Sequence, residues 1–275
     1  MKLFRRAAFS NGDKGGNPAG VVLEEPDIDD DRMQHIAAEL GYSETAFSYP
    51  IDGRWRTRYF APEGEVPFCG HATVALGAVL AQEYGVGAYE LELNQEIITV
   101  EGAREGHGWR GRLQSPATNF RDAGSALEEA LAVFPVEEND LSTAFAPVIA
   151  NAGATHLILP VASRKVLKDC MGYNLSAGKD LMRKHGLTTI MFVHEGSQGQ
   201  FDARNAFASG GVIEDPATGA AAAAFAGFLR DGLHRPDRQI TIIQGEDMGM
   251  DSLIEVEIPE ETGSGIWLSG TTRSL

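Results

Sequence analysis

The sequence contains only two cysteines, Cys69 and Cys170, and no CxxC spacing. A disulfide framework, or a structural zinc site built from paired thiols, therefore has little support. The seven histidines are scattered, and neither HExxH nor HxH occurs. From these spacings we expect no metal site.

Long apolar runs and basic residues are also scarce. No stretch approaches the roughly 18 apolar residues of a membrane span, and residues 1–20 lack an apolar run of signal-peptide length, so we expect a cytoplasmic protein. Lys and Arg number 23 against 39 Asp and Glu, a net charge of -16, which disfavours binding to nucleic acid or an anionic membrane. The densest acidic run, 24–31, is predicted to be a solvated face.

Small residues, by contrast, are concentrated in residues 214–229, EDPATGAAAAAFAGFL. The five alanines predict a helix from propensity alone, and because the segment shows no polar stripe we expect it to be enclosed on every side. Asp215, Thr218 and Gly219 stand at its N-terminal end, where unpaired N–H groups and the helix dipole favour an anion. The alternative is a capped core helix with nothing bound.

The segment has a counterpart earlier in the chain. Residues 58–80 and 204–229 both run from arginine through Phe-Ala, a glycine-bearing loop and a short polar stretch into an Ala-rich apolar helix. Residues 69–72, CGHA, align with residues 218–221, TGAA. A repeat on this scale indicates two similar structural units.

The similarity extends upstream of both helices. Each half has a glycine-containing turn and apolar strand, then a helix stopped by glycine, then a second strand. The paired segments are 16–26 with 153–163, 31–40 with 176–185, and 42–49 with 187–194. Further short strands follow in both halves. We therefore predict an α+β protein of two pseudo-repeat domains, each a barrel-like, mostly antiparallel sheet around a central helix. The domains are expected at 1–118 and 119–275, joined near 116–126, with the last strand a candidate to return to the first.

The halves differ where chemistry is expected. Glu44 falls where the second half has Thr188 or Thr189, and Asp215 precedes the second central helix. If the two helix N-termini face each other across a cleft, one carboxylate comes from each half, which is an acid/base arrangement. The alternatives are a strand carboxylate facing outward for Glu44 and a helix cap for Asp215.

In this order and at these separations, the motifs GNPAGVVL, YSETAF, RYFAPEGEVPFCGHATVALG and EDPATGAAAAA resemble the PhzF phenazine-biosynthesis family, whose fold is that of diaminopimelate epimerase. The resemblance covers essentially the whole chain. It implies an active site in the cleft between the two domains, a homodimer, and no metal or organic cofactor. The named member of the family isomerises trans-2,3-dihydro-3-hydroxyanthranilate by moving a proton along a conjugated system.

The resemblance also implies roles for individual residues. The proton-transferring glutamate of the family matches Glu44, the histidine of its CGH motif matches His71, and the aspartate of DPATG matches Asp215, so we expect these three to be catalytic. A histidine at a helix N-terminus is otherwise commonly structural. The residues expected to bind substrate are Ser43, Gly70, Gly219, Ala220, Asn17 and Thr218.

Two of these binding residues carry a reservation. Ala220 stands where the named member has serine, so one substrate hydroxyl contact is lost and the same substrate is not assumed. Asn17 lies in an Asn-Pro turn, which forms without a ligand.

The predicted function is a cofactor-independent isomerase of a small carboxylic acid. One alternative is an epimerase or dehydratase of amino or hydroxy acids on the same fold; another is a non-catalytic protein that binds a small molecule. Epimerases of this fold use two thiols, and because Thr218 occupies the second thiol position, Cys69 is expected to be a small buried residue or a minor contact. A Cys-His hydrolase is not expected, since residues two apart on a helix do not face each other.

Overall fold

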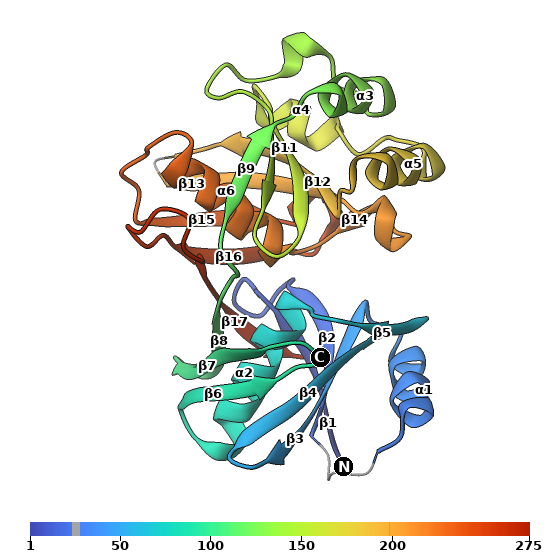
Figure 1. Cartoon of the computed structure of the whole chain (residues 1–275), viewed down its shortest axis with the longest axis vertical. Helices are drawn as coiled ribbons and strands as arrows, with labels where there is room; N and C mark the ends of the chain where they lie inside the picture. The colour runs from blue at the N-terminus through green and yellow to red at the C-terminus, as the bar shows by residue number, and fades with distance from the viewer. Residues whose placement is uncertain (24–27, 198) are drawn as a thin grey trace. The chain divides into compact units, whose positions relative to one another are not determined.

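The computed structural model describes residues 1–23, 28–197 and 199–275. The first part of the acidic run, residues 24–27, lies outside the described residues, as does residue 198. The chain forms two compact units, 1–114 with 269–275 and 115–268, which are described separately below (Figure 1).

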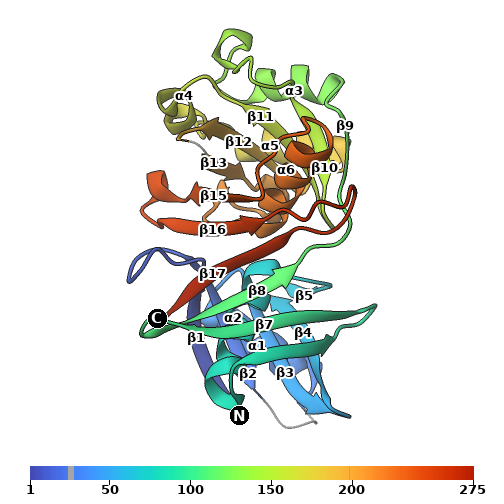
Figure 2. The ribbon, with the colours of Figure 1, turned by 90° about the vertical axis from the view of Figure 1, so that its left-hand side faces the viewer.

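The first unit is a closed barrel of eight strands. Each strand pairs with the next in the order β1, β2, β3, β4, β6, β7, β8 and β17, and β17 pairs back to β1, so β17 lies between β8 and β1 (Figure 2). A barrel closed in this way leaves no unpaired edge strand. The strands are β1 (Lys2–Ala8), β2 (Asn17–Leu23), β3 (Glu44–Ile51), β4 (Arg54–Ala61), β5 (Gly64–Val66, paired with β4), β6 (Gly87–Glu92), β7 (Ile97–Glu105), β8 (Gly108–Gln114) and β17 (Trp267–Ser274).

Helix α2 (Gly70–Tyr84) packs inside this barrel, and α1 (Asp30–Leu40) packs outside, against β3 and β4. Every residue of α2 from 71 to 81 is buried. The helix approaches the strands closely because glycines remove side chains at the contacts. A Cβ at Gly77 would lie 2.6 Å from Val100, and one at Gly111 would lie 2.1 Å from the carbonyl oxygen of Val74.

The second unit repeats this scheme. Its strands are β9 (Asn119–Asp122), β10 (Val148–Asn151), β11 (Thr155–Pro160), β12 (Thr189–Glu195), β13 (Gln200–Ala206), β14 (Glu214–Asp215), β15 (Gln239–Gln244) and β16 (Ser252–Glu257). Its helices are α3 (Ser125–Val133), α4 (Arg164–Asp169), α5 (Leu175–His185) and the central α6 (Gly219–Asp231), with short 3₁₀ turns η1 (Glu138–Asp140), η2 (Ala208–Gly210) and η3 (Glu246–Met248).

Strand pairing confirms the pseudo-repeat and the predicted fold class. In each unit an antiparallel pair is followed by a parallel pair, an antiparallel pair, a short antiparallel addition, a parallel pair and an antiparallel pair. The register identifies equivalent residues. Ala19 of β2 pairs with Glu44 of β3, and His156 of β11 pairs with Thr189 of β12, so Thr189 occupies the position of Glu44.

The predicted helix ends are confirmed as well. Helices α1 and α5 stop at Gly41 and Gly186, which adopt the left-handed conformation with φ of 65° and 64°. The enclosure of α6 is confirmed, since nearly all of its residues are buried. Helices α3 and α4 were not predicted by the repeat, and with α5 they build a further core outside the sheet of the second unit. Within the described ranges, no helix is long and apolar enough to cross a membrane.

Candidate active site

Three residues expected at the site from the first half lie together in the first unit. Glu44 begins β3 and His71 lies in the first turn of α2, with the His71 Nε2 3.5 Å from the Glu44 Oε2. The Ser43 hydroxyl oxygen is 3.3 Å from the same nitrogen. The Cys69 thiol donates a hydrogen bond of 3.4 Å to the Glu44 Oε2. We call these four residues the Glu44 cluster.

Cys69 and His71 are in contact, so the expectation that they do not face each other is wrong. The Cys69 Sγ lies 3.3 Å from the His71 Nδ1. The argument from helix spacing failed because Cys69 is the N-cap of α2 and not a helical residue. Its backbone is extended, with φ of -146° and ψ of 114°, and its side chain therefore projects in a different direction from that of a residue within the helix.

The Glu44 carboxylate is shielded but still reached by solvent. Its side chain is 17% exposed and that of His71 is 8% exposed. The hypothesis of an outward-facing strand carboxylate does not fit this environment. A carboxylate held by a thiol and an imidazole beside a helix N-terminus has the surroundings of a group that exchanges protons with a bound molecule.

The Glu44 cluster also offers a set of metal donors that the sequence spacing did not reveal. One ligand atom each from Glu44, Cys69 and His71 lies within 4.8 Å of the others. Carboxylate, thiolate and imidazole are all zinc ligands. In the present arrangement the thiol proton is donated to the carboxylate, and a cation would have to displace that proton.

In the second unit the expected residues gather at the start of α6. Asp215, at the end of β14, is 9% exposed, and its Oδ2 accepts a hydrogen bond of 2.6 Å from the Thr218 hydroxyl. The N-cap of α6 is Thr218. The Gln244 Nε2 donates to the Asp215 carbonyl oxygen at 2.6 Å, and its Oε1 accepts from the Thr218 N–H at 3.2 Å. We call these three residues the Asp215 cluster.

The two glycines expected to bind substrate open the two central helices, Gly70 in α2 and Gly219 in α6. The first N–H groups of a helix have no acceptor within the helix and can hold an anion. A Cβ built on Gly70 would meet only the Phe68 ring, at an ordinary 4.0 Å. The first unit therefore has room for a side chain at residue 70, and close approach of a ligand is a better reason for glycine there.

The remaining expected residues lie near the clusters in sequence and register. Asn17 is buried at the start of β2, two residues before Ala19, which pairs with Glu44. Alternating strand geometry puts Asn17 and Ala19 on the same face of the sheet. Ala220 is half-buried and is the second residue of α6.

Sequence reasoning missed three buried polar residues of the second unit, Gln244, Asn205 and His156, and named Thr189 only as a candidate counterpart of Glu44. Gln244 and His156 stand next to apolar residues of their strands, in ITIIQ and THLIL, and this was the available signal for these two. Burial lowers the pKa of His156 to about 3. Its Nε2 has no hydrogen-bond partner among the described residues.

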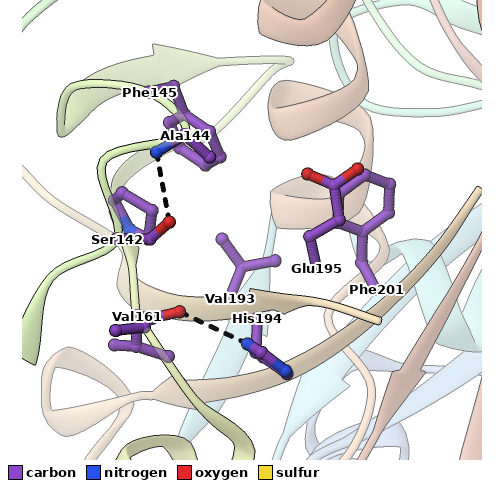
Figure 3. Close-up of a pocket in the computed structure, with 10 residues that line it drawn as sticks. Ser142, Ala144, Phe145, Val161, Val193, His194, Glu195 and Phe201 are labelled. Atoms are coloured by element: carbon purple, nitrogen blue, oxygen red, sulfur yellow. Dashed lines mark hydrogen bonds between the residues drawn. The ribbon is translucent and has the colours of Figure 1, made fainter. Parts of the chain in front are cut away.

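A cavity elsewhere in the second unit holds none of the expected residues. Its volume is about 160 Å³, and Ser142, Phe145, His194 and Glu195 are among the residues that line it (Figure 3). The His194 Nδ1 lies 3.4 Å from the Val161 carbonyl oxygen, and the Glu195 carboxylate pairs with Arg235 at 2.8 Å. These polar groups are engaged with the fold, so we base the candidate site on the two clusters.

The duplicated strand topology, with an enclosed central helix in each half, defines the diaminopimelate epimerase-like class of fold. The family model described as "Phenazine biosynthesis-like protein" matches residues 6–272. The chain therefore belongs to the PhzF family, and the sequence-based recognition of that family is confirmed.

Individual relatives agree with this assignment. An isomerase of Deinococcus radiodurans, described as uncharacterized, is 32% identical over 265 residues, covering 92% of this chain and 85% of the relative. The structure of a PhzF-family protein from Bacillus anthracis superimposes with a TM-score of 0.86 at 26% identity, covering 100% of this chain and 98% of the other. A probable proline racemase from Agrobacterium radiobacter shares the fold alone, with a TM-score of 0.65 at 8% identity, covering 99% of this chain and 90% of the other.

Proposed function

We propose that the protein is a cofactor-independent isomerase that moves a proton within a small carboxylic acid, with Glu44 as the base. Membership of an isomerase-containing family supports the reaction class. The observation that carries the proposal is the environment of the Glu44 carboxylate, which is shielded, still accessible, and in contact with His71 and Cys69.

The substrate carboxylate would bind at helix N-termini, where the N–H groups around Gly70 and Gly219 are unpaired within their helices. Ser43 and His71 supply further hydrogen-bonding groups beside Glu44. A small acid held in this way keeps its adjacent C–H group within reach of the base.

In the proposed reaction Glu44 removes a proton from an activated carbon. The C–H bonding pair enters the conjugated system of the substrate, whose negative charge is stabilised by N–H donors and by His71. The protonated Glu44, which solvent still reaches, exchanges its proton with water and then protonates another carbon, so atoms and electrons balance without an oxidant or reductant. Asp215 orients polar groups of the substrate. In this proposal both clusters act on one substrate in the cleft that the family resemblance implies, and the protein is a homodimer.

A thiol in contact with the proposed base favours an epimerase as the second candidate. The Cys69 thiol donates to Glu44, and proteins described as a racemase and an epimerase share the fold. In an epimerase, a base on one face keeps the proton that it removes, and a second acid delivers another proton to the same carbon from the opposite face. Loss of configuration at that carbon, with no shift of a double bond, distinguishes the epimerase from the isomerase.

Deuterium incorporation tests the proposed function. The protein is incubated in D2O with a panel of unsaturated and amino carboxylic acids, and proton signals are followed by NMR. We expect wild type to introduce deuterium at a substrate carbon, and Glu44→Gln to be slower by about 10²- to 10⁴-fold because the base is lost. Glu39→Gln is the matched control, since Glu39 is an exposed carboxylate of the same unit.

The labelled position reports the reaction class. Deuterium at a carbon other than the one deprotonated identifies an isomerase. A compound that binds tightly yet shows neither deuterium exchange nor conversion with wild type contradicts the acid/base role for that ligand and supports a non-catalytic binding protein.

A further inference from the structure

A chain of buried hydrogen bonds crosses the second unit and ends at Asp215. The His156 Nδ1 lies 2.7 Å from the Thr189 Oγ1, and the Thr189 hydroxyl donates to the Asn205 Oδ1 at 2.9 Å. The Asn205 Nδ2 donates to the Gln244 Oε1 at 3.1 Å. All four side chains are at most 1% exposed, so the chain is isolated from solvent.

The backbone beside Asp215 sets the direction of this chain. The Gln244 amide can bond in only one orientation, because its Nε2 faces the Asp215 carbonyl oxygen and its Oε1 faces the Thr218 N–H. Asn205 must then offer its Nδ2 to Gln244 and accept with its Oδ1. Because the Thr189 hydroxyl donates to Asn205, its oxygen accepts the Nδ1–H of His156.

The same amide reaches the Asp215 side chain through Thr218. The Gln244 Nε2 lies 3.1 Å from the Thr218 Oγ1, and the Thr218 hydroxyl donates to the Asp215 Oδ2 at 2.6 Å. Gln244 therefore joins three points of the turn before α6: the carbonyl oxygen of residue 215, and the N–H and hydroxyl groups of residue 218.

Stability alone does not explain why these buried residues are polar. The far end of the network leaves the His156 Nε2 buried without a hydrogen-bond partner among the described residues, which is unfavourable because the desolvation of that atom is not compensated. Apolar residues of similar volume in a core are commonly as stable as a polar network or more so. The network instead fixes one orientation for each of its members.

We propose that Gln244 is a positioning residue that holds the turn carrying Asp215, and that Asn205, Thr189 and His156 hold the Gln244 amide in its orientation. We call the hydrogen bonds from Gln244 to residues 215 and 218 the Gln244 clamp. The clamp fixes the conformation of the 215–218 turn whether or not a substrate binds. Its effect on catalysis rests on the proposed function, in which Asp215 orients the substrate.

Hydrogen exchange tests the clamp without any substrate. In Gln244→Met the acceptor for the Thr218 N–H is lost, and we expect that amide to exchange with solvent about fivefold faster, since one hydrogen bond contributes about 1 kcal/mol. The Ala222 N–H, which donates to the Thr218 carbonyl within α6, is the internal reference. Gln200→Met, the same substitution elsewhere in the second unit, is the control. An unchanged Thr218 rate in Gln244→Met overturns the clamp.

Kinetics test the effect on the reaction. We expect Gln244→Met to lower kcat for deuterium exchange about 100-fold, as for a catalytic group displaced by about 1 Å, with a smaller change in KM. Gln200→Met keeps the wild-type rate. Full activity together with fast Thr218 exchange overturns the positioning role. A wild type inactive on every compound counts against the proposed function instead, and the clamp is then judged by Thr218 exchange alone.

Gln244→Glu is a second variant, and its side chain has nearly the same shape as glutamine. It tests the positioning role of Gln244 even if Gln244→Met does not fold. Its carboxylate cannot donate to the Asp215 carbonyl oxygen, whereas its protonated form can. We therefore expect its activity relative to wild type to recover as the pH falls. A deficit that is independent of pH overturns the proposal, because mere disturbance of packing would behave in that way.

Discussion

At the residue scale, two glycines of α2 are needed for different reasons: Gly77 for packing of the fold and Gly70 for the proposed binding site. Gly70 starts α2, and a Cβ there would meet only the Phe68 ring, at 4.0 Å. Gly77 lies in the same helix, and a Cβ there would stand 2.6 Å from Val100. The two glycines therefore have different physical reasons to be glycine.

Gly70→Ala is expected to preserve the fold and weaken substrate binding. Alanine in a helix is more favourable than glycine by about 0.5–1 kcal/mol, so the melting temperature stays the same or rises slightly. The added methyl group stands where the substrate carboxylate approaches the helix N-terminus, so KM rises. Thermal unfolding and exchange kinetics measure the two effects.

Gly77→Ala is the matched control and is expected to lower stability by about 1–3 kcal/mol through overpacking. If Gly70→Ala binds substrate as wild type does, residue 70 is not part of the binding site.

The Cys69 thiol distinguishes the two enzymatic candidates. In the isomerase, Glu44 is the base and the thiol only donates to it at 3.4 Å. Cys69→Ser keeps a donor of similar size, so we expect the exchange rate to stay within about tenfold of wild type. If the Cys69 thiolate itself removed the proton, Cys69→Ser would lower the exchange rate far more than tenfold, because a serine hydroxyl is a much weaker acid and rarely forms the basic alkoxide. Cys170→Ser, at the other buried cysteine, controls for the loss of a buried thiol.

At the element scale, the pair β11–β12 buries a histidine whose charge state couples stability to pH. Burial lowers the pKa of His156 from 6.5 to about 3. Below pH 6.5 the unfolded chain binds a proton that the folded chain does not bind until the pH nears 3. The His156 contribution to stability is therefore complete above pH 6.5 and is lost as the pH falls through this window, at about 1.4 kcal/mol per pH unit.

Urea unfolding at a series of pH values between 6.5 and 3 measures this effect. Between pH 6.5 and 3 we expect the free energy of unfolding of His156→Leu to fall less steeply than that of wild type. The two slopes should differ by about 1.4 kcal/mol per pH unit, the value for one proton. His35→Leu is the control, because the His35 side chain is 60% exposed. Equal slopes for wild type and His156→Leu would show that the histidine is not buried in its neutral form.

The same elements show what the sequence could and could not reveal. Gly41 and Gly186 ended two helices as predicted, and the alanine run of α6 indicated an enclosed helix, because these signals are local. Contact between Cys69 and His71 was missed because it depends on the extended backbone of a cap residue. The links of Gln244 were missed because its partners Asn205, Asp215 and Thr218 are 26 to 39 residues away in the sequence and come close to it only in the folded unit.

At the scale of the whole molecule, duplication made the fold predictable. Two halves with the same order of local signals define one strand topology twice, and the family resemblance gave that topology a name. Duplication does not predict how residues at equivalent positions of the two halves differ in role. Glu44 in one half and Thr189 in the other occupy the same register position, one in the proposed catalytic cluster and the other in the buried hydrogen-bond chain.

The barrel of the first unit is closed by a strand from the far end of the sequence. Residues 6–8 of β1 pair with residues 272–274 of β17, which also pairs with β8. Without residues 269–275, β1 would pair only with β2 and β8 only with β7, so both would become edge strands of an open sheet. The second unit, 115–268, has its own core around α6 and a separate cluster around Phe192.

A chain ending at Leu268 is therefore expected to lose amide protection across the first unit and to keep it in the second. Hydrogen exchange followed by NMR or mass spectrometry resolves the two units, since cooperative units open separately. Adding a synthetic peptide of residues 267–275 should restore protection to β1 and β8, because it supplies the missing partner of both. Protection of β1 and β8 that survives truncation would mean that the barrel does not depend on closure by β17. Uniform loss across both units would mean that the chain unfolds as one cooperative structure.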